Sequence, residues 1–306
     1  MKLGINGTGL VQQANVSKIT EHAQLAAAQG FSSYWLAEHP TGGLDALTVL
    51  AAVGQQVAGI ELGTAIVPTY PRHPMVLAGQ TLTTAGILGA RLTLGIGLSH
   101  EPMMAQLGIG FDKPIRHLRE YLSILMALLR EGAVDYEGET LSCRAQLFVK
   151  PQIETPVVVA ALGPQALGVA GRLADGTTLA WVGPKTVRDH IAPRLRDAAA
   201  AAGRSAPRII ATLPVCVTED ASRVRDAIAR GLSLYGRLPS YRAMFEREGV
   251  SGPADLAIVG SAAEVRDGIE RMAQAGVTDF AASEFCLSRM EFEQTRETLT
   301  TLVNGV

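Results

Sequence analysis

The pattern that most constrains the fold is a regular alternation of short apolar runs with helical stretches along nearly the whole chain. Eight of these runs have the length and composition of buried β-strands, and helical patterns fall between them. The predicted strands are Lys2–Asn6, Ser33–Glu38, Glu61–Val67, Leu92–Leu98, Pro156–Leu162, Thr177–Val182, Arg208–Val217 and Thr278–Glu284. Eight strand–helix repeats in 306 residues fit a (β/α)8 TIM barrel better than a doubly wound sheet. The sequence therefore predicts an α/β barrel, with residues 1–306 forming a single domain.

Local signals place several of the helices between these strands. Apolar residues recur at helical spacing over Ile19–Gln29, and Asp45 is a typical N-cap for a helix over Ala46–Val57. A third helix is predicted over Thr186–Ala202 and is expected to stop at Gly203.

Two segments interrupt the alternation. Asp135–Lys150 lies between the fourth helix and the fifth strand, and its EGET sequence resembles the turn of a hairpin, so we expect an insertion over one barrel face. Gly236–Asp255 is rich in glycine, proline and aromatic residues and precedes a helix that Ser261 caps. Long irregular segments in compact domains are often lids, so we expect a lid-like loop here.

Composition excludes several functional classes. The formal net charge is -2 and no basic patch stands out, which argues against nucleic acid as the main partner. The start of the chain lacks the apolar region of a signal peptide, and no run reaches the roughly 20 apolar residues of a membrane span. The three cysteines are far apart, and neither HxH nor HExxH spacing occurs. We therefore expect a cytoplasmic protein with no disulfide framework, no metal site and no membrane contact.

Two neighbouring predicted strands, Glu61–Val67 and Leu92–Leu98, end in loops that point to a ligand. Glycines at Gly95 and Gly97 let a ligand approach the backbone, and Ser99 and His100 follow just before the next helix. Free N–H groups at the start of a helix favour an anion. Because α/β enzymes hold their sites at the carboxyl ends of parallel strands, these loops suggest a cofactor that carries a phosphate.

Several motifs, in order along almost the full chain, resemble those of the luciferase-like monooxygenase superfamily, and more narrowly its branch that uses the deazaflavin coenzyme F420. The motifs are AEHP at Ala37–Pro40, GTAIVPTYPRHP at Gly63–Pro74, RLTLGIGLSH at Arg91–His100, LGIGFDKPIRHLREYLSIL at Leu107–Leu125, ALGPQALGVAGRLADGTTLAW at Ala161–Trp181 and VGSAAEV at Val259–Val265. The resemblance implies a TIM barrel with an insertion, usually dimeric, that binds a flavin or F420 at the carboxyl ends of its strands.

The same resemblance suggests where the chemistry lies. It implies a cis peptide bond between Ala65 and Ile66 behind the cofactor ring, and it places Glu38 and His39 beside the reacting carbon. Since an unperturbed histidine has a pKa near 6.5, His39 suits proton transfer at neutral pH, and Glu38 either orients the imidazole or is itself the acid. Arg72, in the next loop, either pairs with a carboxylate or positions that loop near the cofactor.

The remaining candidates are cofactor contacts, each with a plainer alternative. The resemblance assigns Ser99 and His100 to the ribityl or phosphate part of the cofactor, although a serine before a helix is often only a cap. Gly163, Pro164 and Gln165 open a helix whose free N–H groups suit a phosphate, although such an entry needs no ligand. Trp181 either walls the ring or belongs to the core.

These observations favour an oxidoreductase that transfers a hydride between coenzyme F420 and a small organic substrate. The alternatives are an FMN-dependent luciferase-like monooxygenase or reductase and, from another class, a flavin-binding barrel without catalytic activity. The sequence leaves the substrate open because barrel loops vary freely. Apolar helix faces around Val76–Leu88 and the family resemblance predict a homodimer.

Overall fold

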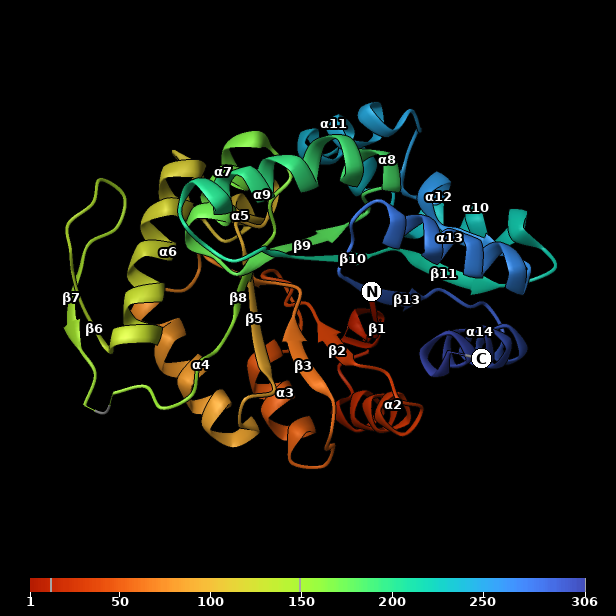
Figure 1. The fold of residues 1–306 in the computed structure, drawn as a ribbon, viewed down its shortest axis with the longest axis horizontal. Helices are drawn as coiled ribbons and strands as arrows, with labels where there is room; N and C mark the ends of the chain where they lie inside the picture. The colour runs from red at the N-terminus through yellow and green to blue at the C-terminus, as the bar shows by residue number, and fades with distance from the viewer. Residues whose placement is uncertain (12, 149, 306) are drawn as a thin grey trace.

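The computed structural model describes residues 1–11, 13–148 and 150–305, and it shows a closed barrel of eight parallel strands with helices around it (Figure 1). The barrel strands, in order, are β1 (Lys2–Asn6), β2 (Ser33–Leu36), β3 (Glu61–Thr64), β5 (Leu92–Gly97), β8 (Val157–Val159), β9 (Gly176–Ala180), β10 (Arg208–Thr212) and β13 (Asp279–Glu284). Pairing of β1 with β13 closes the ring. The predicted TIM barrel is therefore confirmed.

Helices connect the strands on the outside of the barrel. The longer ones are α2 (Val16–Ala28), α3 (Ala46–Gly54), α4 (Pro74–Leu88), α6 (Pro114–Glu131), α7 (Pro164–Leu173), α9 (Ala192–Ala201), α10 (Ala221–Gly231), α13 (Ala262–Gln274) and α14 (Arg289–Asn304). The Asp45 side chain caps α3, and Ser261 caps α13 in a capping box with Glu264, as their positions predict. The third predicted helix instead consists of α8 (Pro184–Thr186), a π-helical turn over Val187–Ile191, and α9.

Two of the predicted strands are each split into two segments. The run Glu61–Val67 divides into β3 and β4 (Val67–Pro68), and the peptide bond between Ala65 and Ile66 is cis, as predicted. The run Arg208–Val217 divides at Leu213 into β10 and β11 (Pro214–Val217). Beyond this break β11 also pairs with β12 (Ile258–Gly260), a strand that the sequence pattern did not reveal.

Large and charged side chains fill the amino-terminal half of the barrel. Trp35 is fully buried among residues of the facing strands, in a small cluster with Val158, Ile210 and Ala281. Below them Arg208 donates hydrogen bonds to Glu61 (2.8 Å) and to Asp279 (2.7 Å). The attraction between these charged groups and their hydrogen bonds offset part of the cost of removing them from water.

Small side chains line the carboxyl half of the interior. Since alternate residues of a strand point to the same face, the inward positions follow from those of the central cluster in steps of two. They are Asn6, Ala37, Ala65, Gly97, Ala160, Ala180, Thr212 and Ser283. None is larger than asparagine or threonine, so this end of the barrel has room for a flat ligand.

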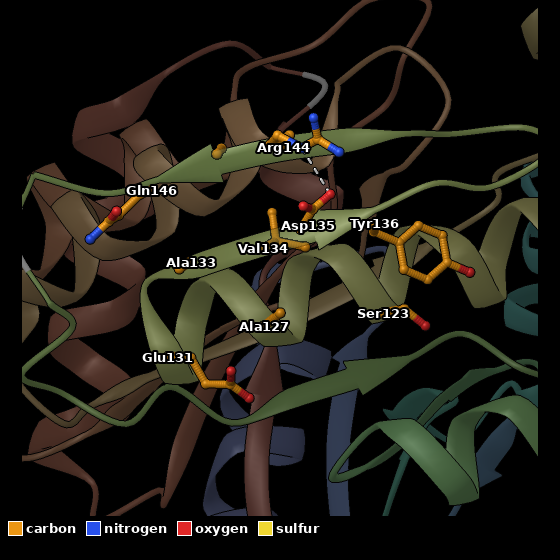
Figure 2. Close-up of a pocket in the computed structure, with 10 residues that line it drawn as sticks. Ser123, Ala127, Glu131, Ala133, Val134, Asp135, Tyr136, Arg144 and Gln146 are labelled. Carbon is orange, nitrogen blue, oxygen red and sulfur yellow. Dashed lines mark hydrogen bonds and ion pairs between the residues drawn. The ribbon is translucent and has the colours of Figure 1, made fainter.

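The predicted insertion is a two-stranded hairpin of β6 (Ala133–Tyr136) and β7 (Cys143–Gln146). It packs along the outer side of α6 rather than across the barrel mouth (Figure 1), and Figure 2 shows the groove between them. The buried carboxylate of Glu120, on α6, accepts hydrogen bonds from the backbone N–H groups of Glu139, Thr140 and Leu141 in the hairpin turn. This carboxylate fixes the turn beside the start of α6.

The lid-like segment is more regular than the sequence suggests. Instead of an irregular loop it contains a 3-10 turn over Tyr235–Arg237, α11 (Pro239–Glu248) and the short α12 (Pro253–Leu256). Glu248 accepts hydrogen bonds from the backbone N–H groups of Lys185 (3.1 Å) and Thr186 (2.6 Å), which anchors α11 to α8. Each proline in this segment begins a helix, where its missing N–H costs nothing.

Within the described ranges, no helix combines the length and the apolar character needed to cross a membrane.

Candidate active site

The candidate site is the carboxyl end of the barrel, where the loops after the strands converge. At its base the Asn6 amide donates a hydrogen bond to the Thr212 hydroxyl across the barrel (3.3 Å). Around them lie the small inward residues described above. Small side chains with a few polar atoms among them have the composition of a small-molecule site.

His39 lies in the loop that follows β2, after the strand has ended at Leu36. Its Nε2 atom is buried and has no hydrogen-bond partner among the described residues. Burial lowers the pKa of the imidazole below its usual value, because the charged form loses hydration. A buried polar nitrogen without a partner is uncommon in folded proteins, which makes this atom a candidate for contact with a bound group.

Glu38 is held by the protein itself. Arg72 donates hydrogen bonds to Glu38 (3.0 Å) and to Asp45 (2.9 Å), and the N–H of Ala46 donates to the Glu38 carboxylate (3.3 Å). Burial raises the pKa of the Glu38 carboxyl, while the Arg72 guanidinium opposes that rise. Of the two roles left open for Arg72, pairing with carboxylates is the one the structure shows.

Ala65 and Ile66 form the wall beside His39. The Ile66 carbonyl accepts a hydrogen bond from the N–H of Glu38 (3.0 Å), and the N–H of Ala65 donates to the carbonyl of Leu36 (2.7 Å). The Glu38–His39 loop is therefore fixed directly to the segment that contains the cis peptide bond.

Packing between neighbouring strands accounts for both glycines of β5. A Cβ atom on Gly95 would lie 1.9 Å from the Thr64 carbonyl oxygen, and one on Gly97 would lie 3.0 Å from the Ala160 Cβ. The Thr64 hydroxyl also exchanges hydrogen bonds of 2.8 Å with the backbone of Gly95. Gly97 is at the barrel mouth. Gly95 lies one layer deeper, where Thr64 of β3 comes so close that no side chain fits.

Ser99 and His100 begin the loop that leads to α5 (Glu101–Gln106). Ser99 adopts a left-handed backbone conformation with φ of 60°, and its hydroxyl donates to the Met103 sulfur (3.6 Å). The N-cap residue is His100, whose side chain makes no capping hydrogen bond. Ser99 is therefore not a helix cap, and the His100 ring is left to pack over the mouth.

An aromatic cluster closes the opposite side of the mouth, and sequence analysis missed most of it. Trp181, at the end of β9, has a left-handed φ of 57° and packs edge-on against Tyr235, with ring centroids 5.6 Å apart. Tyr235 also packs against Tyr241 (5.2 Å), and the His100 ring lies 5.8 Å from Tyr241. Tyr241 lies in the predicted lid segment and was the available signal, whereas Tyr235 precedes that segment and the other partners are distant in sequence.

The residues Gly163, Pro164 and Gln165 lie at the amino end of α7, as expected. Gly163 is the N-cap and Pro164 the first helical residue. Beside them is a cleft between α6 and α7 that Arg116, Arg119 and Arg172 line. Sequence analysis missed this group because Arg172 is more than 50 positions away from Arg116 and Arg119, which lie three residues apart on one helix.

No group of three or more histidine, cysteine, aspartate or glutamate side chains that could hold a metal ion occurs within residues 1–11, 13–148 and 150–305. The groove between α6 and the hairpin in Figure 2 contains none of the predicted site residues. The barrel mouth is therefore the place where the predicted residues meet.

The sequence profile of the luciferase-like monooxygenases matches residues 2–279. The chain belongs to this family.

Two curated relatives show which activities occur among proteins similar to this chain. It is 28% identical over 262 residues to a 5,10-methylenetetrahydromethanopterin reductase of Archaeoglobus fulgidus, covering 84% of this chain and 76% of the relative. It is 30% identical over 234 residues to an F420-dependent glucose-6-phosphate dehydrogenase of Kineococcus radiotolerans, covering 72% and 68% of the two chains.

Solved structures of the luciferase-like fold superpose on the whole chain. One is an F420-dependent secondary alcohol dehydrogenase in complex with an F420–acetone adduct, with a TM-score of 0.80 and 17% identity, covering 100% of this chain and 98% of the other. At this identity the likeness establishes the fold, and the arguments about the site depend on this chain's own residues.

In this luciferase-like barrel we expect His39 to remain neutral at pH 7. Because burial disfavours the imidazolium, its ring should titrate below the ordinary value of about 6.5. NMR titration of the unliganded protein measures this, with the resonance assigned by its absence in His39→Gln. A midpoint at or above about 6.5 would contradict the buried environment.

Proposed function

We propose that the protein is an F420-dependent oxidoreductase that transfers a hydride to or from a small organic substrate. The observation that carries the proposal concerns His39, in the loop fixed to the Ala65–Ile66 wall: its Nε2 is buried and has no hydrogen-bond partner in the described part of the chain. The relatives' activities support the choice of cofactor. We further propose that residues 1–306 act as one domain in the cytoplasm.

The residues present fit a deazaflavin cofactor. The layer of small side chains leaves space for a flat ring against Ala65, Ile66 and Gly97. The first turn of α7, after Gly163, offers free N–H groups to a phosphate. When bound, the deazaflavin accepts or supplies a hydride. Ser99, His100 and Trp181 would then contact the parts of the cofactor between the ring and the phosphate.

The protein's own contribution is proton transfer and exclusion of water. A neutral His39 can accept a proton at Nε2 from a substrate hydroxyl as that carbon loses a hydride, or return a proton to a carbonyl in the reverse direction. Glu38 is then a positioning residue, because Arg72 and Ala46 already bind its carboxylate. The aromatic cluster of Trp181, Tyr235 and Tyr241 shields the mouth from solvent.

Cofactor choice is tested by titrating the purified protein with coenzyme F420 and with FMN while recording fluorescence. We expect binding of F420 at micromolar concentration and much weaker binding of FMN. Tight FMN binding with no F420 binding would contradict the proposal and favour an FMN-dependent monooxygenase or reductase. Binding of F420 without reduction by any alcohol, sugar phosphate or amine donor would favour the non-catalytic barrel.

The role of His39 is tested by comparing His39→Ala with Glu38→Gln. His39→Ala should lower turnover by roughly 10²–10⁴-fold, the usual contribution of general acid–base catalysis, while cofactor affinity stays near that of the wild type. Glu38→Gln should lower turnover less, since the amide oxygen can still accept from one of the donors that bind the carboxylate and the backbone N–H of residue 38 still binds the Ile66 carbonyl. Stopped-flow measurement of deazaflavin absorbance gives both values, and a larger loss in Glu38→Gln than in His39→Ala would assign the proton to Glu38 instead.

We also propose a homodimer formed through α3 and α4. Neither helix contains a charged residue, and the two helices pack side by side. The outer face of α4 exposes Val76 (61%) and Ile87 (41%) on a surface that also contains Gly79, Thr83 and Gly86. An uncharged face with small and apolar side chains is typical of a surface that a second copy covers.

The double variant Val76→Asp/Ile87→Asp places two like charges on this face and should convert a dimer into monomers. Light scattering at micromolar concentration measures the change. Met290→Asp, at an exposed position on α14, is the matched control and should leave the mass of the wild type unchanged. A wild-type protein that is already monomeric, or a double variant that remains dimeric, would refute the proposed interface.

A further inference from the structure

A positively charged cleft runs along the outer surface from the proposed phosphate position. α6 and α7 pack against each other, and Arg116, Arg119, Gln165, Gly168 and Arg172 line the cleft between them. Figure 1 shows both helices on the same side of the barrel. The cleft begins beside the first turn of α7 and continues down that helix toward Arg172.

Most of the positive charge in this cleft is not neutralised by the protein. Arg119 and Arg172 make no ion pair in the part of the chain that the structure describes, and Arg116 pairs only with Glu139 of the hairpin turn, at 2.7 Å. Two carboxylates close in sequence to these arginines are used elsewhere. Glu120 accepts the N–H groups of the hairpin turn, and Asp175 pairs with Arg130 and Arg204.

The shape of the cleft depends on Gly168. The Arg172 side chain extends back along α7, so that its Nη1 lies 3.2 Å from where a Cβ on Gly168 would be. A larger residue at position 168 would push this guanidinium out of the cleft. Gly168 therefore lets Arg172 face the same cleft as Arg116 and Arg119.

Arg116 already pairs with one carboxylate, that of Glu139 in the hairpin turn. The Glu139 side chain lies between Lys113 and Arg116, at the end of α6 nearest the barrel mouth. Guanidinium groups bind carboxylate and phosphate oxygens through paired N–H donors, so successive arginines suit a ligand with successive negative charges.

We propose that the α6–α7 cleft is a binding site for a chain of oxyanions, carboxylates or phosphates, held by Arg119 and Arg172 with Arg116 at its entrance. One source of such a chain is the distal part of the bound cofactor, in which case the site rests on the proposed function and extends it. The other source is a separate polyanion, such as a polyphosphorylated metabolite.

The test measures three ligands against three proteins by titration at low salt. The ligands are coenzyme F420, whose side chain carries a phosphodiester and several carboxylates, its deazaflavin–ribityl fragment without those groups, and inorganic tripolyphosphate. The proteins are the wild type, Arg119→Gln/Arg172→Gln, and Arg266→Gln as a control for loss of an exposed arginine on α13.

If the cofactor is the source, the double variant should bind F420 roughly 10-fold more weakly than the wild type, with a smaller salt dependence, while the fragment binds both equally. If the ligand is separate, F420 binding stays unchanged and tripolyphosphate binding is lost in the double variant only. The site is refuted if the double variant and the control bind all three ligands as the wild type does. Failure of the wild type to bind either deazaflavin would refute the proposed function, while tripolyphosphate still reports on the cleft.

Discussion

The pairing of β1 with β13 closes the sheet, and the position of every candidate residue depends on that closure. Lys2 to Ile5 lie beside Asp279 to Ala282, so the first and last strands of the barrel become neighbours. In a closed ring of parallel strands all carboxyl ends meet on one side. Loops that are more than 100 residues apart in sequence, those of His39 and Trp181, therefore border one mouth.

The barrel interior has two halves with different roles. Trp35 and the Arg208–Glu61–Asp279 pairs fill the amino-terminal half, which leaves no room for a ligand. At the carboxyl end the inward side chains shrink to alanine, glycine, serine, threonine and asparagine. The same fold thus provides a packed base and a carboxyl end lined by small side chains, and the Arg72–Glu38 pair holds the His39 loop beside that end.

Sequence patterns revealed most of the fold because the strands are short apolar runs with clear ends. Lys2–Asn6 was predicted to the residue, and the caps at Asp45 and Ser261 were correct. The breaks at Ala65–Ile66 and Leu213 within the predicted strands have no counterpart in the apolar pattern, which continues through them. In the first case only the resemblance to a family located the break. The lid segment was misread because its prolines begin helices as well as loops.

The site was predictable in part. Loop position and family motifs pointed to Glu38, His39, Gly97 and Gly163, but they could not show that Arg72 binds Glu38 or that Thr64 explains Gly95. The aromatic cluster and the arginine cleft were missed for a physical reason. Each is assembled from elements far apart in the chain, so that only the packing of α6 on α7, or of the lid on β9, brings the members together.

The central claim is that the barrel mouth holds a deazaflavin ring between the Ala65–Ile66 wall and His39. A crystal structure of the protein with coenzyme F420 tests it most directly. We expect the ring to lie on the small-residue layer, with His39 Nε2 facing the space beside the reacting carbon and a phosphate at the first turn of α7. A ring bound elsewhere, or an imidazole of His39 that points away from the ring, would contradict the account.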